Sequence, residues 1–172
     1  KRLRVEVFYF DPRTLEEILE HIRMLGKMLE REKAASDLIK QLKAKLKEVK
    51  PLKNRPTVIY EISARTLKVA GAHSIITSII EHAGGENLIK VKKKHVLISP
   101  EKVISLAPDF YIYQVGPMNP MNKNPVVPDK RPYFRSLKSR VVKVDEYEFA
   151  RPGINAFQAV VDLNRIFLEV EK

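Results

Sequence analysis

From Thr57 onward, short β-prone segments alternate with segments of helical spacing. Helices are predicted at about 75–83, from Ser99 onward and at about 154–170, with a helical turn near 133–138. The predicted strands are 57–62, 88–91, 110–115 and 141–144. Such alternation is typical of an α/β fold with a largely parallel sheet. We therefore expect a three-layer lobe in which helices cover both faces of a largely parallel sheet of four strands or slightly more.

The residues before Thr57 follow a different pattern. Residues 3–10 alternate and predict a strand, and Thr14 is expected to cap a helix with Glu17 completing a capping box. Gly26 is expected to interrupt this helix, and a second, long helix is predicted from about 32 to 49. The opening strand is thereby separated from the later sheet, so its pairing partners would have to come from elsewhere.

The composition excludes several classes of site. The chain has 172 residues, enough for one domain or one domain and a piece of another. The absence of cysteine excludes disulfides, iron–sulfur clusters and thiolate zinc sites. No apolar run approaches the roughly 20 residues that span a bilayer. The chain starts at Lys1 without a signal-peptide pattern, and we interpret it as a fragment or mature form whose targeting segment is not included.

The charge is unusual: 32 Lys and Arg against 21 Asp and Glu give a net charge of +11. A basic surface suits nucleic acid, an anionic membrane or an anionic ligand. A thermophile surface rich in Lys, Glu and Ile explains the same composition. Both interpretations stay open.

Motifs of common enzymes do not occur. The chain contains no GK[ST] phosphate loop, no G-x-G-x-x-G and no G-x-S-x-G. The four histidines lack metal-ligand spacing: His21, His73, His82 and His95. We therefore predict neither an enzyme nor an intrinsic metal or cofactor.

In open α/β sheets, ligands bind beyond the carboxyl ends of the strands. We expect the loops there to be residues 63–73, 92–98, 116–132 and 145–153. The first three carry Asp129 as their single acid and eight basic residues: Arg65, Lys68, Lys92, Lys93, Lys94, Lys123, Lys130 and Arg131. Such a rim would favour an anionic ligand. Met118 and Met121 in the long loop could pad an apolar ligand face or fill gaps beneath the loop.

Five stretches, taken in order, resemble one family. They are the segment 14–35, V-I-Y-E-I at 58–62, A-G-A-H-S-I-I-T-S-I-I-E-H-A-G-G-E-N at 70–87, I-S-P-E-K-V-I-S-L-A-P-D-F-Y-I-Y at 98–113 and A-R-P-G at 150–153. This order resembles the class III solute-binding proteins of ABC importers, which serve iron-siderophore, haem and cobalamin uptake. In that family, two α/β lobes are joined by a rigid long helix, and the ligand lies in the cleft between them.

The resemblance implies a division of the chain. Residues 1–30 would be the last strand and helix of an amino-terminal lobe, 31–50 the linking helix and 51–172 the carboxy-terminal lobe. The chain would then act outside the cytoplasm, anchored by a segment that it does not contain. It would capture an iron chelate, haem or cobalamin and dock on the membrane permease. The alternative from the charge alone is a basic nucleic-acid-binding domain, but the basic residues are spread and form no known module.

The resemblance also assigns residues. Glu101, in S-P-E, matches the glutamate that docks on permease arginines. Ligand contacts carry over to Lys68, His95 and Tyr147. Gly71, Met118 and Arg151, which lie in the adjoining motifs and the long loop, are further candidates. Cobalamin binders tend to have aromatic residues at the positions of Lys68 and His95, so this chain departs from them.

With one lobe present, the chain is expected to bind ligand weakly, because a cleft ligand normally buries most of its surface. The opening strand and the apolar face of the following helix would then lack their covering lobe. We therefore expect that the chain can form a homodimer through residues 3–25.

Overall fold

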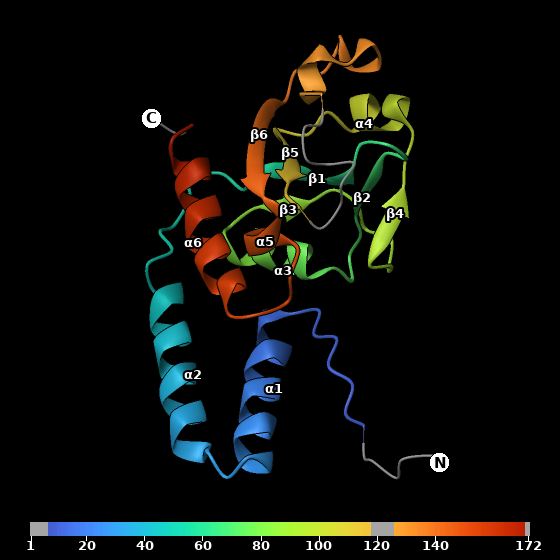
Figure 1. The fold of residues 1–172 in the computed structure, drawn as a ribbon. Coiled ribbons are helices and arrows are strands. Elements are labelled where there is room, and N and C mark those ends of the chain that lie inside the picture. Colours follow the sequence, from blue (N-terminus) through green and yellow to red (C-terminus); the bar gives the residue numbers. More distant parts are fainter. Residues whose placement is uncertain (1–6, 118–125, 171–172) are drawn as a thin grey trace, which may run out of the picture.

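The computed structural model describes residues 7–117 and 126–170, and within them one sheet of six strands lies between helices (Figure 1). The strands run in the order β4-β2-β1-β5-β6, and the short β3 pairs with the start of β1. Their bounds are β1 (Thr57–Ser63), β2 (Lys68–Ala70), β3 (Glu86–Asn87), β4 (His95–Leu97), β5 (Phe110–Val115) and β6 (Arg140–Asp145). β1, β3, β5 and β6 are parallel, whereas β2 is antiparallel to both β1 and β4.

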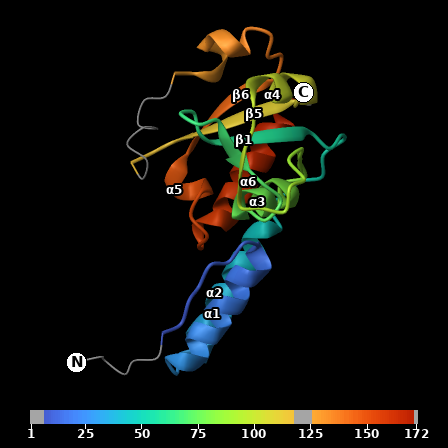
Figure 2. The same cartoon turned by 90° about the vertical axis from the view of Figure 1, so that its right-hand side faces the viewer.

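Helices cover both faces of this sheet. They are α1 (Leu15–Met28), α2 (Glu32–Leu46), α3 (Ile75–His82), α4 (Pro100–Leu106), α5 (Glu146–Phe149) and α6 (Asn155–Leu168), with 3-10 turns at Pro128–Lys130 and Pro132–Phe134. Figure 2 shows α4 on one side of the sheet, α3, α5 and α6 on the other, and the α1–α2 hairpin beyond them. The expected three-layer α/β architecture is therefore confirmed.

The alternation of side chains along β1 explains the two cores. Val58 and Tyr60 point into the core shared with α3 and α6, whereas Ile59 points into the core beneath α4. Both sets are fully buried. A strand that is covered on both faces needs apolar or aromatic residues at nearly every position, which is the pattern of a parallel sheet.

The predicted strand at 88–91 is wrong in position. The strand is instead β3, directly before it, and the side chain of Asn87 ends it. The Asn87 amide donates to the carbonyl of Ala70 at 3.0 Å and to Thr77 Oγ1 at 2.7 Å, and its oxygen accepts from the N–H of Ile89 at 3.0 Å. These bonds turn the backbone away from β1. The antiparallel ribbon of β2 and β4 was not predicted, because each strand has only three residues.

The predicted opening strand at 3–10 is not present in its described part. Residues 7–14 form no strand, and 3–6 lie outside the described residues. No described strand borders this segment, and without a neighbour its backbone cannot form a ladder. Asp11 holds the segment instead, through ion pairs with Lys94 at 2.8 Å and Arg13 at 3.2 Å.

The α1–α2 hairpin corrects a second expectation. Thr14 caps α1 as predicted, since its side chain accepts from the N–H of Glu17 at 3.1 Å, but the Glu17 carboxylate accepts from the N–H of Arg13. Gly26 does not interrupt α1. It lies within the helix, where a Cβ atom would come within 2.4 Å of the Cβ of Ala35 on α2. Gly26 thus allows the two helices to approach closely.

The α1 face that was expected to be uncovered is in fact buried. Leu15 and Ile18 are 1% and 4% exposed and belong to the core that α3 and α6 share. The N-terminus of α1 is fixed to α3, because the N–H of Leu15 donates to Ser78 Oγ at 3.2 Å. This removes Leu15 and Ile18 from the expected dimer surface, whereas Val7, Phe8 and Tyr9 stay exposed, as do Met24 and Leu25 near the end of α1.

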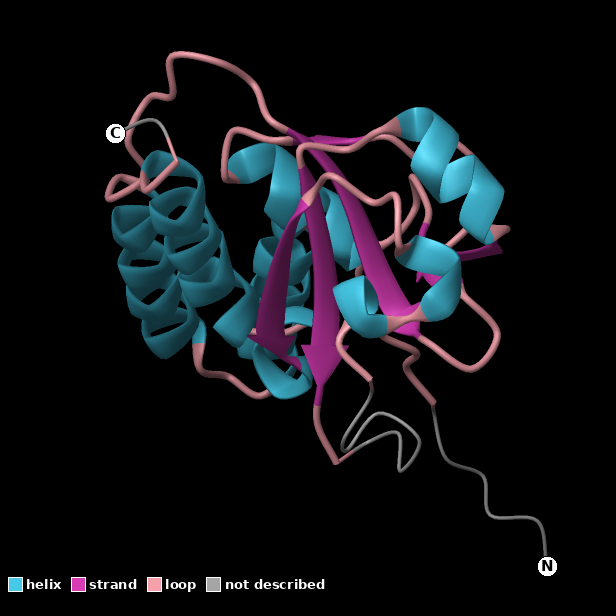
Figure 3. Ribbon diagram, turned by 90° about the horizontal axis from the view of Figure 1, so that it is seen from above, coloured by secondary structure: helices cyan, strands magenta, loops and turns pink. Residues whose placement is uncertain are grey.

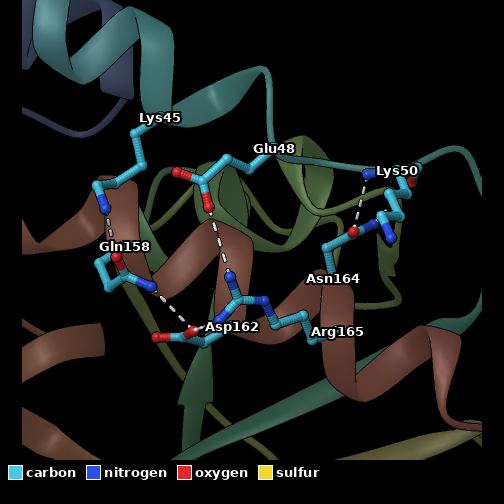
Figure 4. Close-up of polar contacts among 7 residues, drawn as sticks. All are labelled: Lys45, Glu48, Lys50, Gln158, Asp162, Asn164 and Arg165. Carbon is cyan, nitrogen blue, oxygen red and sulfur yellow. Dashed lines mark hydrogen bonds and ion pairs between the residues drawn. The ribbon is translucent and has the colours of Figure 1, made fainter.

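A polar seam joins the end of α2 to α6 (Figure 4). Asn164 is buried, accepts from the backbone N–H of Lys50 at 2.9 Å and donates to the carbonyls of Lys50 at 2.9 Å and Ala83 at 3.0 Å. Lys45 donates to Gln158 on α6 at 2.6 Å. The direction in which the chain leaves α2 is therefore set by side chains of α6.

Among the described helices, none is both long and apolar enough to cross a membrane.

Candidate ligand-binding edge

The carboxyl ends of β1, β5 and β6 lie at one edge of the sheet, and their arrowheads point to the same side in Figure 3. We call this the carboxyl edge; it comprises the segments that follow these strands, 64–67, 116–117 and 146–153. In open α/β sheets this edge is where ligands bind.

The segment after β6 presents an aromatic ring and a cation together. Asp145 caps α5 by accepting from the N–H groups of Tyr147 at 2.7 Å and Glu148 at 3.2 Å. Tyr147 is half exposed, and the guanidinium carbon of Arg151 lies 4.6 Å from the centre of its ring. The guanidinium lies over one face of the ring, so the pair presents aromatic surface and a positive charge together, which suits a planar ligand that carries anionic groups.

A buried polar chain fixes α5 against the sheet. The Tyr60 hydroxyl donates to Gln114 at 3.1 Å, and the Gln114 amide donates to Glu146 at 3.2 Å. Burial, followed by the charges of Glu146 and Asp145, raises the pKa of Tyr60 well above its ordinary value. A Cβ atom at Gly116 would meet the Cβ of Glu146 at 2.5 Å, so α5 can lie this close only beside a glycine. Tyr147 is therefore presented by a rigid support.

On the opposite face of the sheet, Glu61 and Arg131 form a buried ion pair. Both terminal guanidinium nitrogens of Arg131 donate to the Glu61 carboxylate, Nη2 at 2.9 Å, and the side chains of Arg131 and Glu61 are 4% and 3% exposed. The Tyr111 hydroxyl donates to the same carboxylate at 2.5 Å, and Arg131 Nε donates to the carbonyl of Val126 at 2.9 Å. Arg131 thus ties the end of the long loop to β1. We had expected it in a solvent-facing positive rim, and that expectation is wrong because the side chain is buried.

The β2–β4 ribbon places Lys68 and His95. Lys68 lies opposite Ser63 at the carboxyl end of β1, and it also pairs with Leu97. His95 pairs with Ala70, one diagonal step from Lys68 on the same face of the ribbon. The expectation that residues 92–98 lie beyond the carboxyl ends is wrong for 92–94. Because β4 runs in the same direction as β1, these residues precede it and bond to the backbone at 71–73.

The environment of His95 is electropositive. Burial, and then the charges of Lys68 and Lys94, lower the pKa of His95 from its ordinary 6.5. The imidazole is therefore neutral at pH 7, with one ring nitrogen free to accept a hydrogen bond from a ligand.

The remaining candidates differ in their surroundings. Gly71 is buried, and a Cβ atom there would lie 2.2 Å from the carbonyl oxygen of Lys93. The close approach of the two backbone segments therefore requires glycine at position 71. Met118 lies outside the described residues, as does Met121. Glu101 is exposed in the first turn of α4, where Ser99 is the cap. Backbone hydrogen bonding, and then Ser99, lower the pKa of Glu101, so it is an available carboxylate at neutral pH.

The structure brings these side chains together in two groups. Tyr147 and Arg151 lie at the β6 end of the sheet, and Lys68 and His95 at the β4 end. Four strand spacings of about 4.8 Å separate the two ends, a width of roughly 19 Å. Two sets of buried hydrogen bonds support the edge, one through Glu146 and one through Glu61. They join residues that lie 32 to 70 positions apart in the sequence, so no local sequence pattern predicted Glu146 or Glu61 as supporting residues.

No group of three His, Cys, Asp or Glu that could hold a metal ion occurs in the described part of the chain. Two hollows lie elsewhere. One of about 610 Å³ lies at the amino ends of β5 and β6, beside Asp109 and Arg140, and one of about 500 Å³ lies between α1 and α2, beside Met24 and Ile39. The candidate residues line neither of them.

Comparison with solved structures shows the same fold. A substrate-binding protein of an ABC transporter from Listeria monocytogenes EGD-e superimposes with a TM-score of 0.81 at 22% identity, over 94% of this chain and 67% of that one. The haem complex of IsdE from S. aureus gives 0.78 at 22% identity, over 95% and 68%. The haem-binding protein BhuT, with two haems, gives 0.72 at 18%, over 95% and 66%. Identities this low establish the fold alone.

Sequence comparison identifies a relative. The chain is 28% identical, over 118 residues, to the high-affinity heme uptake system protein IsdE of Staphylococcus aureus (strain bovine RF122 / ET3-1). The match spans 65% of this chain and 40% of that protein. The relatives are binding proteins and not enzymes, in agreement with the sequence-based prediction. The family model described as periplasmic binding protein matches residues 3–127, well over half of the chain. The chain therefore belongs to the periplasmic binding protein family.

Proposed function

We propose that the chain is part of the substrate-binding component of an ABC importer and that it captures an iron complex, such as haem or a ferric hydroxamate. The observation that carries this proposal is the pairing of Tyr147 with Arg151 on the carboxyl edge, together with Lys68 and His95 on the adjoining β2–β4 ribbon. An aromatic face with flanking cations matches a planar, anionic complex. The relatives with haem and ferric hydroxamate in their descriptions support the same ligand class.

The proposal includes the division of the chain. Residues 1–30 would belong to an amino-terminal lobe, 31–50 would link the lobes, and 51–172 would form the carboxy-terminal lobe. The seam between α2 and α6 supports a linker that is fixed to the second lobe. The ligand would lie between the lobes, outside the cytoplasm, and Glu101 would dock on a cationic patch of the permease.

Cobalamin is the less favoured ligand. Lys68 and His95 stand where cobalamin binders tend to have aromatic residues, and both make their end of the edge polar. Nucleic acid is not favoured either, because Arg131 and Lys94, which contributed to the basic count, are engaged by Glu61 and Asp11.

A titration of the 172-residue chain with haem, ferrioxamine B and cyanocobalamin, followed by absorption spectra, tests this proposal. We expect the chain to bind an iron complex saturably but weakly, because one lobe covers only about half of a ligand that lies in a cleft between two lobes. Tyr147→Ala and Arg151→Ala should each weaken it, whereas Arg135→Ala, an exposed arginine before β6, should not. The absence of saturable binding for all three ligands would contradict the proposal, as would equal binding by the edge variants and the control.

A further inference from the structure

Residues 90–94, which we call the basic loop, have the sequence K-V-K-K-K and lead into β4. Backbone N–H groups of residues 71–73 donate to three carbonyl oxygens of the loop, at 2.9 to 3.2 Å. The glycine at 71 permits this contact, since a side chain there would collide with the loop. Because the carbonyls point inward and are satisfied, the loop is a fixed turn whose side chains are directed outward.

The charges at the tip of this turn are not compensated. Lys90 pairs with Glu86 at 2.6 Å and Lys94 with Asp11 at 2.8 Å. Within the described residues, Lys92 and Lys93 are exposed and form no ion pair. Lys68 adds a further positive charge on the neighbouring strand.

Exposed apolar side chains accompany these lysines. Val91 in the loop is 47% exposed, and Leu97 at the end of the three-residue β4 is 68% exposed. Tyr9 is 86% exposed and lies two residues before Asp11, which is bound to Lys94. Apolar groups of this size gain free energy when a partner covers them.

We propose that the basic loop, with Val91 and Leu97, is a docking surface for an anionic lipid membrane. Lysines near an anionic bilayer surface are attracted to its headgroup phosphates, each by about 1 kcal/mol, or roughly fivefold in partitioning. Aliphatic and tyrosine side chains beside them enter the interfacial region, where apolar and polar groups meet. The surface adjoins the Lys68–His95 end of the ligand candidates, but Val91, Lys92, Lys93 and Leu97 are not among those candidates, so this docking is a property beyond ligand capture.

Other anionic partners fit the surface less well. A small anion would need a concave site, whereas Lys92 and Lys93 stand on an outward turn. Single-stranded nucleic acid favours aromatic platforms on which bases stack, whereas the basic loop contains no aromatic residue and offers lysines with Val91.

Sedimentation with vesicles tests the docking surface. The chain is mixed with vesicles of phosphatidylcholine, alone or with about one third phosphatidylglycerol, in dilute buffer and with added salt that screens surface charges. We expect binding to the anionic vesicles that salt weakens, and a loss of at least about 25-fold in Lys92→Glu/Lys93→Glu. Val91→Ser/Leu97→Ser should weaken binding without any change of charge.

The control is Lys33→Glu/Lys43→Glu, which changes the net charge by the same amount on exposed positions of α2. Equal losses in the loop and α2 variants would show that only the net charge matters and would overturn the proposal. Absence of binding to anionic vesicles would overturn it too. Binding to duplex DNA that resists Val91→Ser/Leu97→Ser and exceeds vesicle binding, or full competition by inorganic phosphate, would assign the surface to another anion.

Discussion

At the scale of single residues, the buried ion pair of Glu61 and Arg131 is the contact whose disruption should destabilise the fold most. Two charges are removed from water, and they are compatible with burial only because each satisfies the other and Tyr111 donates to the carboxylate. Removing one member leaves an uncompensated charge, which costs more than the pair contributes.

Arg131→Met should therefore lower the free energy of unfolding by about 3–5 kcal/mol, measured by urea denaturation. The matched control is Arg140→Met, because Arg140 forms an exposed pair with Glu169 at 3.4 Å and should change stability by about 1 kcal/mol or less. Glu61→Leu/Arg131→Met should recover much of the loss. A cost for Arg131→Met as small as that of the control would show that the buried pair does not form.

The lowered pKa of His95 makes the stability of the fold depend on pH. Burial and the charges of Lys68 and Lys94 lower its pKa, so by NMR the ring should reach half-protonation below pH 6.5. Since the unfolded chain binds this proton more readily, acidification through this range should destabilise the fold, and stability is fully present only above the unfolded pKa. Lys68→Ala should raise the midpoint, whereas Lys102→Ala on α4 should not. A midpoint above 6.5 in the unmodified chain would contradict the electropositive environment.

At the scale of elements, the contact between α1 and α2 reverses a general rule. An alanine in the middle of a helix is normally more stable than a glycine by about 1 kcal/mol. At Gly26 the added methyl group would lie 2.4 Å from the Cβ of Ala35, so the helices would have to separate.

Gly26→Ala should accordingly lower the melting temperature. Gly153→Ala is the control, since nothing lies within 4 Å of a Cβ atom there, and it should be neutral or slightly stabilising. If calorimetry showed that Gly26→Ala is the stabilising one, the close approach of the hairpin would be disproved.

The elements also show how far the sequence could be interpreted. β5 lies at 110–115 as predicted. β1 extends one residue beyond its predicted end and β6 one residue beyond each of its predicted ends, because these β-branched and aromatic runs are bounded by prolines and turns. β2 and β4 were missed because three residues carry no readable period. The opening residues alternate like a strand, but a strand also needs a neighbour, and local pattern does not report on neighbours.

The candidate site was predictable only in part. The helices predicted at about 75–83 and from Ser99 onward are confirmed as α3 and α4, because their starts depend on local caps, at Ser74 and Ser99, and α4 carries Glu101. The pairing of Tyr147 with Arg151 depends on the turn after α5, and Arg131 reaches Glu61 across 70 residues. Such contacts depend on tertiary packing, and a single sequence does not record them.

At the scale of the whole molecule, the proposed importer makes a prediction about Glu101. In an importer assembled with the intact binding protein, Glu101→Ala should reduce transport several-fold while ligand affinity stays unchanged, because the carboxylate is exposed on α4 and is not among the ligand candidates. Glu81→Ala, an exposed glutamate on α3, is the matched control. Loss of ligand binding by the purified Glu101→Ala protein would argue against a docking role.

The central claim is that the carboxyl edge and the adjoining β2–β4 ribbon bind an iron complex. NMR mapping of the ¹⁵N-labelled chain with gallium(III) protoporphyrin IX, a diamagnetic substitute for haem, tests it most directly. We expect changes in amide chemical shift that are concentrated at Lys68, His95, Tyr147 and Arg151. Changes centred instead on the hollow between α1 and α2, or on the one beside Asp109 and Arg140, would contradict it, as would a spectrum that does not change.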